Sequence, residues 1–76
     1  MPHVIVKLAT GRSEQTQSRI AAAVTEAVMA TANCEAAAVS VAIEDVEPVD
    51  RVEKVYKPEI AGKARDLYKK PGYNPL

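Results

Sequence analysis

Apolar and polar residues alternate along the first part of the chain, and this alternation predicts a strand over residues 3–9. One face of that strand is wholly apolar and carries Val4, Val6 and Leu8. The other face is mixed and carries His3, Ile5 and Lys7. We expect the apolar face to be covered by a helix, which leaves the mixed face free to line a site or an interface.

A longer segment, residues 14–32, has apolar residues at the spacing of a helix. The stripe consists of Ile20, Ala23, Val24, Ala27 and Val28. Gly11 permits a tight turn before this segment. Ser13 is a good N-cap, and Asn33 can take the left-handed conformation that ends a helix. These signals together predict a helix over residues 14–32.

A second alternating segment predicts a strand over residues 38–46, in which Val39, Val41 and Ile43 share one face. A strand, a long helix and a strand imply a parallel pair with a right-handed crossover. Parallel sheets need both faces covered, and one helix covers only one. The pattern therefore predicts an α+β fold, a β-α-β subunit that depends on a partner subunit.

The remaining residues read as a C-terminal region of short helices. Val49, Val52, Val55 and Tyr56 predict one over residues 49–56, which Pro58 breaks or restarts. A second short helix is expected over residues 59–69, followed by an extended tail over residues 73–76. We expect the whole chain, residues 1–76, to form a single domain.

The composition makes a self-sufficient core difficult. The 76 residues include no Trp, no Phe and only three Tyr, and a chain of this size is marginally stable alone. Cys34 is the only cysteine and cannot form an internal disulfide, and His3 is the only histidine, so we expect no metal and no other cofactor. Association of identical subunits is the remaining remedy. We favour a hexamer over a dimer because the sheet has an uncovered face; the alternative is that the C-terminal region covers this face and stops assembly at the dimer.

Charge and hydropathy narrow the class of partner. Ten basic and ten acidic residues cancel, so no strong field draws the protein to nucleic acid or to an anionic membrane. The start of the chain has no basic segment followed by an apolar run, and no stretch reaches the roughly 20 apolar residues that span a bilayer. We therefore expect a cytoplasmic protein.

Three segments carry a family resemblance. They are Met1-Pro2-His3-Val4-Ile5-Val6, the loop Gly11-Arg12-Ser13, and Val39-Ser40-Val41-Ala42-Ile43. In this order they resemble the 4-oxalocrotonate tautomerase family of the tautomerase superfamily. The rest of the chain, with Val55-Tyr56-Lys57-Pro58-Glu59-Ile60, is similar to a bacterial subgroup with a longer C-terminus.

The resemblance implies a mechanism for this chain. Met1 is removed, and the secondary amine of Pro2 becomes the catalytic base of a keto–enol isomerase (tautomerase). Neighbouring cations and a dry pocket would bring the pKa of such an amine toward neutrality, where a base works best. Arg12 matches an arginine that binds the substrate carboxylate, which a guanidinium can do with two parallel hydrogen bonds.

Two positions depart from the pattern of the family, and each has two readings. Ser40 stands where a second arginine is expected, so it is either a weaker substrate contact or an ordinary strand residue. Arg51 stands near the place of a large aromatic, so it either supplies the missing charge or points to water. His3 follows Pro2 and either lines the pocket or remains partly exposed on the strand.

The substrate that fits this reading is a small enolisable 2-oxo acid or an arylpyruvate-like ketone. One alternative is hydration or dehalogenation of an unsaturated acid, in which a protonated Pro2 would act as the acid. Another alternative is a non-catalytic assembly or binding subunit, which the departures at Ser40 and Arg51 keep open.

Overall fold

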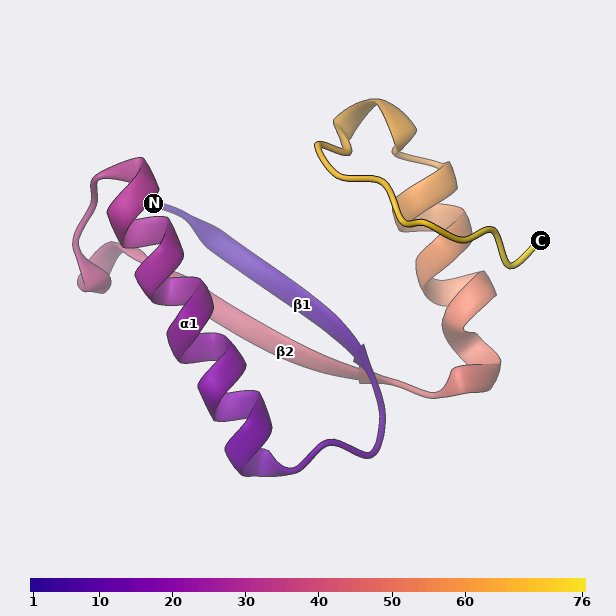
Figure 1. The fold of residues 1–76 in the computed structure, drawn as a ribbon, viewed down its shortest axis with the longest axis horizontal. Helices are drawn as coiled ribbons and strands as arrows, with labels where there is room; N and C mark the ends of the chain where they lie inside the picture. The colour runs from indigo at the N-terminus through magenta and orange to yellow at the C-terminus, as the bar shows by residue number, and fades with distance from the viewer.

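The computed structural model describes residues 1–76 and contains two parallel strands joined by a long helix (Figure 1). Strand β1 spans His3–Ala9 and strand β2 spans Ser40–Val46. Their register pairs His3 with Ser40 at one end and Ala9 with Val46 at the other. The α+β class and the parallel β-α-β arrangement are therefore confirmed, and β1 has the predicted bounds.

Helix α1 spans Glu14–Ala32, as its apolar stripe predicted. Gly11 adopts a positive φ of 108° in the turn before it. The Thr16 N–H donates to Ser13 Oγ at 3.1 Å, which satisfies one of the free amides of the first turn. Asn33 ends the helix in the left-handed conformation, with φ 55°. The signals for the start and the end of this helix are all local, so the sequence was sufficient to place it.

Strand β2 begins two residues later than predicted. Residues Ala36–Ala38 instead form a 3-10 turn, η1, in which the Val39 N–H donates to the Ala36 carbonyl at 3.1 Å. The Ser40 N–H then donates to the Pro2 carbonyl at 3.1 Å. Pro2 has no N–H to continue the ladder, so β2 finds no further partner on β1 before Ser40.

The prediction of two short helices separated by Pro58 is wrong. A 3-10 turn, η2, spans Pro48–Asp50, and a single π-helix, η3, spans Arg51–Ala61 with Pro58 inside it. In an α-helix the ring of Pro58 would clash with the carbonyl of Lys54. In the wider π-helix each amide bonds to the carbonyl five residues earlier, so the ring of Pro58 no longer meets the carbonyl of Lys54.

The helix predicted over residues 59–69 is also wrong beyond Ala61. The Gly62 N–H closes the last turn of η3 by donating to the Lys57 carbonyl at 2.8 Å. Only a 3-10 turn, η4, follows at Ala64–Asp66. Pro71 disfavours helical backbone at Lys70, which accounts for part of the irregular structure in the last ten residues.

Helix α1 covers one face of the strand pair and leaves the other open (Figure 1). A hydrogen bond of 2.7 Å from Gln17 Nε2 to Asp45 Oδ1 ties α1 to β2. On the open face, Ile5 is 50% exposed and lies beside Ala42 in the register. The mixed face that the sequence predicted is thus the one that α1 does not cover, and η3 approaches it at Lys7.

No residue of the chain is buried. The accessible surface is 5823 Å², whereas a compact monomer of this mass exposes about 4500 Å². The difference, roughly 1300 Å², exceeds the ~800 Å² that each partner contributes to a standard interface. Since hydrophobic burial is the main stabilising term in folding, an isolated subunit lacks the core that would hold it together.

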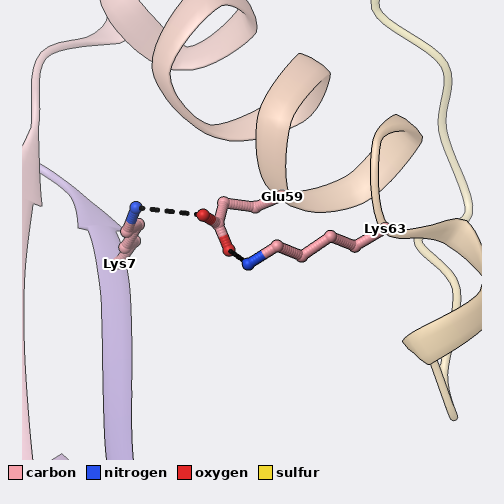
Figure 2. A network of polar contacts seen from close by, with 3 residues as sticks. All are labelled: Lys7, Glu59 and Lys63. Atoms are coloured by element: carbon pink, nitrogen blue, oxygen red, sulfur yellow. Dashed lines mark hydrogen bonds and ion pairs between the residues drawn. The ribbon is translucent and has the colours of Figure 1, made fainter.

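The C-terminal region is attached to the sheet through few contacts. Lys7 Nζ on β1 lies 4.0 Å from Glu59 Oε1 on η3, and Lys63 Nζ lies 3.4 Å from the other oxygen of the same carboxylate (Figure 2). These ion pairs are partly exposed, and pairs of this kind contribute little to stability. The C-terminal region and α1 lie on opposite sides of the strand pair (Figure 1).

We expect the protein to be a homo-oligomer held by the open sheet face. Ala42→Asp places a charge on that face and should dissociate the assembly and lower its helical circular dichroism, because the freed subunit has no buried core. Ala22→Asp makes the same change on the exposed side of α1 and should leave the assembly intact. Analytical ultracentrifugation measures both; a folded wild-type monomer at micromolar concentration would contradict the expectation.

Candidate active site

Pro2 lies directly before β1 and is held by its own carbonyl, which accepts the Ser40 N–H. Its side chain is half-buried, whereas Met1 is 98% exposed. While Met1 is attached, the Pro2 nitrogen is an amide and has no basic lone pair. Loss of Met1 would create a secondary amine at a position fixed by the ladder between the two strands.

His3 and Ser40 form one unit beside Pro2. They are opposite each other in the register, and His3 Nδ1 lies 2.6 Å from Ser40 Oγ. Either the hydroxyl donates to a bare Nδ1, or a protonated Nδ1 donates to the hydroxyl oxygen. The sequence offered these residues as separate candidates, and the strand register brings them together with Pro2.

Arg12 lies at the opposite end of β1 from Pro2. Its Nη1 donates to the carbonyl of Ala9, the last residue of that strand, at 3.0 Å. A strand of seven residues is roughly 23 Å long. Arg12 therefore cannot contact a small molecule bound at Pro2 of the same subunit, nor tune the amine of that Pro2.

Arg51 lies at the same end of the sheet as Arg12. It begins η3, and its Cζ lies 5.6 Å from the centroid of the Tyr73 ring, in a cation–π contact. It forms no ion pair. Arg51 and Tyr73 line a cavity of about 400 Å³ at the C-terminal end of the strands. The reading in which Arg51 only points to water thus misses its contact with Tyr73.

The five candidate residues therefore divide into two groups. Pro2, His3 and Ser40 gather at the N-terminal end of the sheet, whereas Arg12 and Arg51 lie at the C-terminal end. The contact of Tyr73 with Arg51 was not predictable from the spacing of residues, because it joins the tail to a helix more than twenty residues earlier. The only sign of this contact in the sequence was the presence of an aromatic residue in an otherwise irregular tail.

No group of three or more His, Cys, Asp or Glu side chains could hold a metal ion. None of the helices has both the length and the apolar character needed to cross a membrane.

Comparison with known proteins decides the family. The family model described as "Tautomerase enzyme" matches residues 2–52, which include Pro2, Arg12, Ser40 and Arg51. The chain belongs to the tautomerase family. This membership makes it an isomerase, as the resemblance implied, and it agrees with the parallel β-α-β fold.

Similarity to curated tautomerases extends beyond the residues matched by the family model. The chain is 41% identical over 76 residues to a probable tautomerase of Xylella fastidiosa strain 9a5c, covering 100% of this chain and 93% of the relative. It is 39% identical over 75 residues to tautomerase PptA of Klebsiella pneumoniae strain 342, covering 97% and 99%. It is also 33% identical to tautomerase PptA of Enterobacter sp. strain 638 over 75 residues, with the same coverage. The C-terminal region is thus shared with these tautomerases.

We expect Ser40→Ala to retain the fold but to lower tautomerase activity severalfold. The backbone bond between Ser40 and Pro2 survives the substitution, while the hydroxyl held by His3 is lost, which typically costs about 1 kcal/mol. Ser18→Ala, on the exposed side of α1, is the matched control. Steady-state kinetics and thermal unfolding distinguish the two variants; unchanged kcat/KM in Ser40→Ala would assign Ser40 to the strand alone.

Proposed function

We propose that this isomerase is a keto–enol tautomerase that uses the amine of Pro2 as a general base. The observation that carries the proposal is the position of Pro2, fixed between β1 and Ser40 at the end of the sheet and within the residues matched by the family. The substrate is a small enolisable 2-oxo acid or an arylpyruvate-like ketone. The domain that performs the reaction comprises residues 1–76.

The chemistry needs one group that moves a proton. In ketonisation the Pro2 nitrogen accepts the hydroxyl proton of the enol, and the resulting ammonium delivers a proton to the carbon beside the new carbonyl. The reverse sequence forms the enol, so no proton is gained or lost overall. The proline ring limits the directions in which the nitrogen can point, which favours a fixed geometry for transfer. A hydroxyl such as that of Ser40 can stabilise the enolate oxygen by donating to it.

Two subunits are needed to complete the site in this proposal. A two-fold axis that pairs the sheet edges of two subunits antiparallel brings the N-terminal end of one beside the C-terminal end of the other. Pro2, His3 and Ser40 of one subunit then face Arg12 and Arg51 of its partner. The arginines can bind the substrate carboxylate and disfavour protonation of the nearby amine. Edge pairing leaves the open faces of the sheet exposed, and association of such pairs through these faces would supply the burial that the isolated subunit lacks.

The proposal also includes a compartment and partners for the reaction. Cys34 is a free thiol, which suits a reducing compartment, and we place the reaction in the cytoplasm. The partners in this account are the substrate and further copies of the chain.

We expect Pro2→Ala to retain the fold and the assembly but to lose about a hundredfold or more of phenylenolpyruvate ketonisation, the usual cost of a misplaced base. The new N-terminal amine is primary and less rigidly directed, so some activity should survive. The decay of enol absorbance in the ultraviolet measures the rate. Intact mass is the control, because both proteins must have lost Met1 for the comparison to report on the amine.

A different result would end the proposal. If the protein with a free Pro2 amine ketonises phenylenolpyruvate no faster than buffer, and Pro2→Ala behaves in the same way, the tautomerase proposal for this substrate class is wrong. Incubation with an unsaturated halo-acid would then test the hydratase or dehalogenase reaction.

A further inference from the structure

The cavity at the C-terminal end of the sheet has the composition of a binding pocket for a small organic anion. Its volume is about 400 Å³, within the range of small-molecule sites. Its lining combines five apolar residues, two cations and one tyrosine, and includes no carboxylate: Lys7, Leu8, Ala9, Val46, Pro48, Arg51, Val55 and Tyr73. Mostly apolar walls with a few charged groups of one sign favour a ligand with an apolar body and an anionic end.

Arg51 is the cation best placed to bind that anionic end. It has no carboxylate partner, and its one specific contact is the face of Tyr73, 5.6 Å from Cζ to the ring centroid. A cation–π contact does not use the N–H donors of the guanidinium in an ion pair, so they can donate to a carboxylate. The contact with Tyr73 therefore holds Arg51 at the cavity without occupying its donors in an ion pair.

Tyr73 supplies a wall for the apolar body. Its ring packs against Tyr56 on η3, with the centroids 6.4 Å apart and the planes tilted by 40°. This contact, together with Arg51, holds the tail beside the cavity. Tyr73 is still 52% exposed, so part of its ring remains free to contact a ligand. Aromatic pairs of this kind contribute beyond the area that they bury.

Lys7 is less available than Arg51. Its side chain is 28% exposed and faces Glu59, which also pairs with Lys63 (Figure 2). A ligand with two carboxylates would have to draw Lys7 away from Glu59, or else leave one carboxylate against apolar walls without a partner. A ligand with one carboxylate avoids both costs.

We propose that Arg51 and Tyr73 form the specificity pocket of the enzyme, and that this pocket selects arylpyruvate-like monocarboxylates over dicarboxylates. Arg51 binds the carboxylate, and Tyr73 contacts the aryl group. The inference rests on the proposed tautomerase function, in which Pro2 of a second subunit closes the pocket. In the family pattern a large aromatic residue is expected near the position of Arg51. In this proposal Tyr73, from the tail, supplies the aromatic side chain instead.

Binding of unreactive probes tests the pocket independently of catalysis. The probes are 3-phenylpropanoate, its neutral amide and the dicarboxylate adipate, titrated into the assembled protein by calorimetry. We expect 3-phenylpropanoate to bind more tightly than adipate. Arg51→Gln should lower the affinity for 3-phenylpropanoate by about tenfold or more, the usual effect of losing a charged hydrogen bond. The same variant should leave the affinity for the amide unchanged.

Three further variants separate recognition from structure. Arg51→Lys keeps the charge and should recover part of the affinity for 3-phenylpropanoate, although it loses the planar fork. Tyr73→Leu should lower the affinity for 3-phenylpropanoate severalfold and leave the affinity for adipate unchanged. Arg65→Gln removes an exposed arginine outside the cavity and should change nothing. In phenylenolpyruvate kinetics, Arg51→Gln should raise KM far more than it lowers kcat.

Each failure has its own signature. Equal affinity of wild type and Arg51→Gln for 3-phenylpropanoate, or tighter binding of adipate by wild type, would overturn the pocket while Pro2-dependent ketonisation could still stand. Arg51-dependent binding of 3-phenylpropanoate without Pro2-dependent ketonisation would instead overturn the proposed function and, with it, the enzymatic role of the pocket.

Discussion

A two-stranded parallel sheet with a helix on only one face cannot enclose a core, and the rest of this structure depends on that constraint. Not one of the 76 residues is buried. The apolar side of β1 and β2 meets α1, but Ile5 and Ala42 lie on the open face. In water such a face is costly. The open face is therefore the surface that we expect further copies of the chain to cover.

The same geometry bears on the proposed site. Strand β1 holds Pro2 at one end and Arg12 at the other, so the proposed base and the proposed carboxylate-binding cation of one subunit lie far apart. Antiparallel pairing of the sheet edges would place the cationic end of one subunit at the catalytic end of the other. It would leave the open faces exposed, and association of further copies through those faces would bury them. In this account, activity depends on the paired edges and stability depends on the covered faces.

The parts of the fold that the sequence predicted well are those determined by local signals. Residue alternation places β1, and a cap at Ser13 with a left-handed Asn33 places α1. The start of β2 depends on where its neighbour ends, because Pro2 offers no amide beyond Ser40. The C-terminal region was predicted poorly, since a π-helix can accommodate Pro58 where an α-helix would break.

The candidate site was predicted only in part, because the contacts among its residues depend on strand register and tertiary structure. The sequence indicated Pro2, Arg12, Ser40, Arg51 and His3, but not their distances. The pairing of His3 with Ser40 follows from the strand register, and the residue pattern does not determine that register. The separation of Pro2 from Arg12 follows from strand length, which elementary geometry supplies once β1 has been placed. The cation–π contact between Arg51 and Tyr73 is a tertiary contact that only the structure reveals.

The most direct test of the shared site is complementation between two inactive variants. Pro2→Ala and Arg12→Ala are co-expressed with different tags, the mixed assemblies are purified through both tags, and phenylenolpyruvate ketonisation is measured. If each site takes Pro2 from one subunit and Arg12 from another, random assortment of equal amounts should restore about a quarter of the wild-type sites in mixed hexamers, or about half of them in mixed dimers. If both residues serve the same subunit, every site carries one defect. Mixed assemblies that remain as inactive as the separate variants would therefore contradict the account.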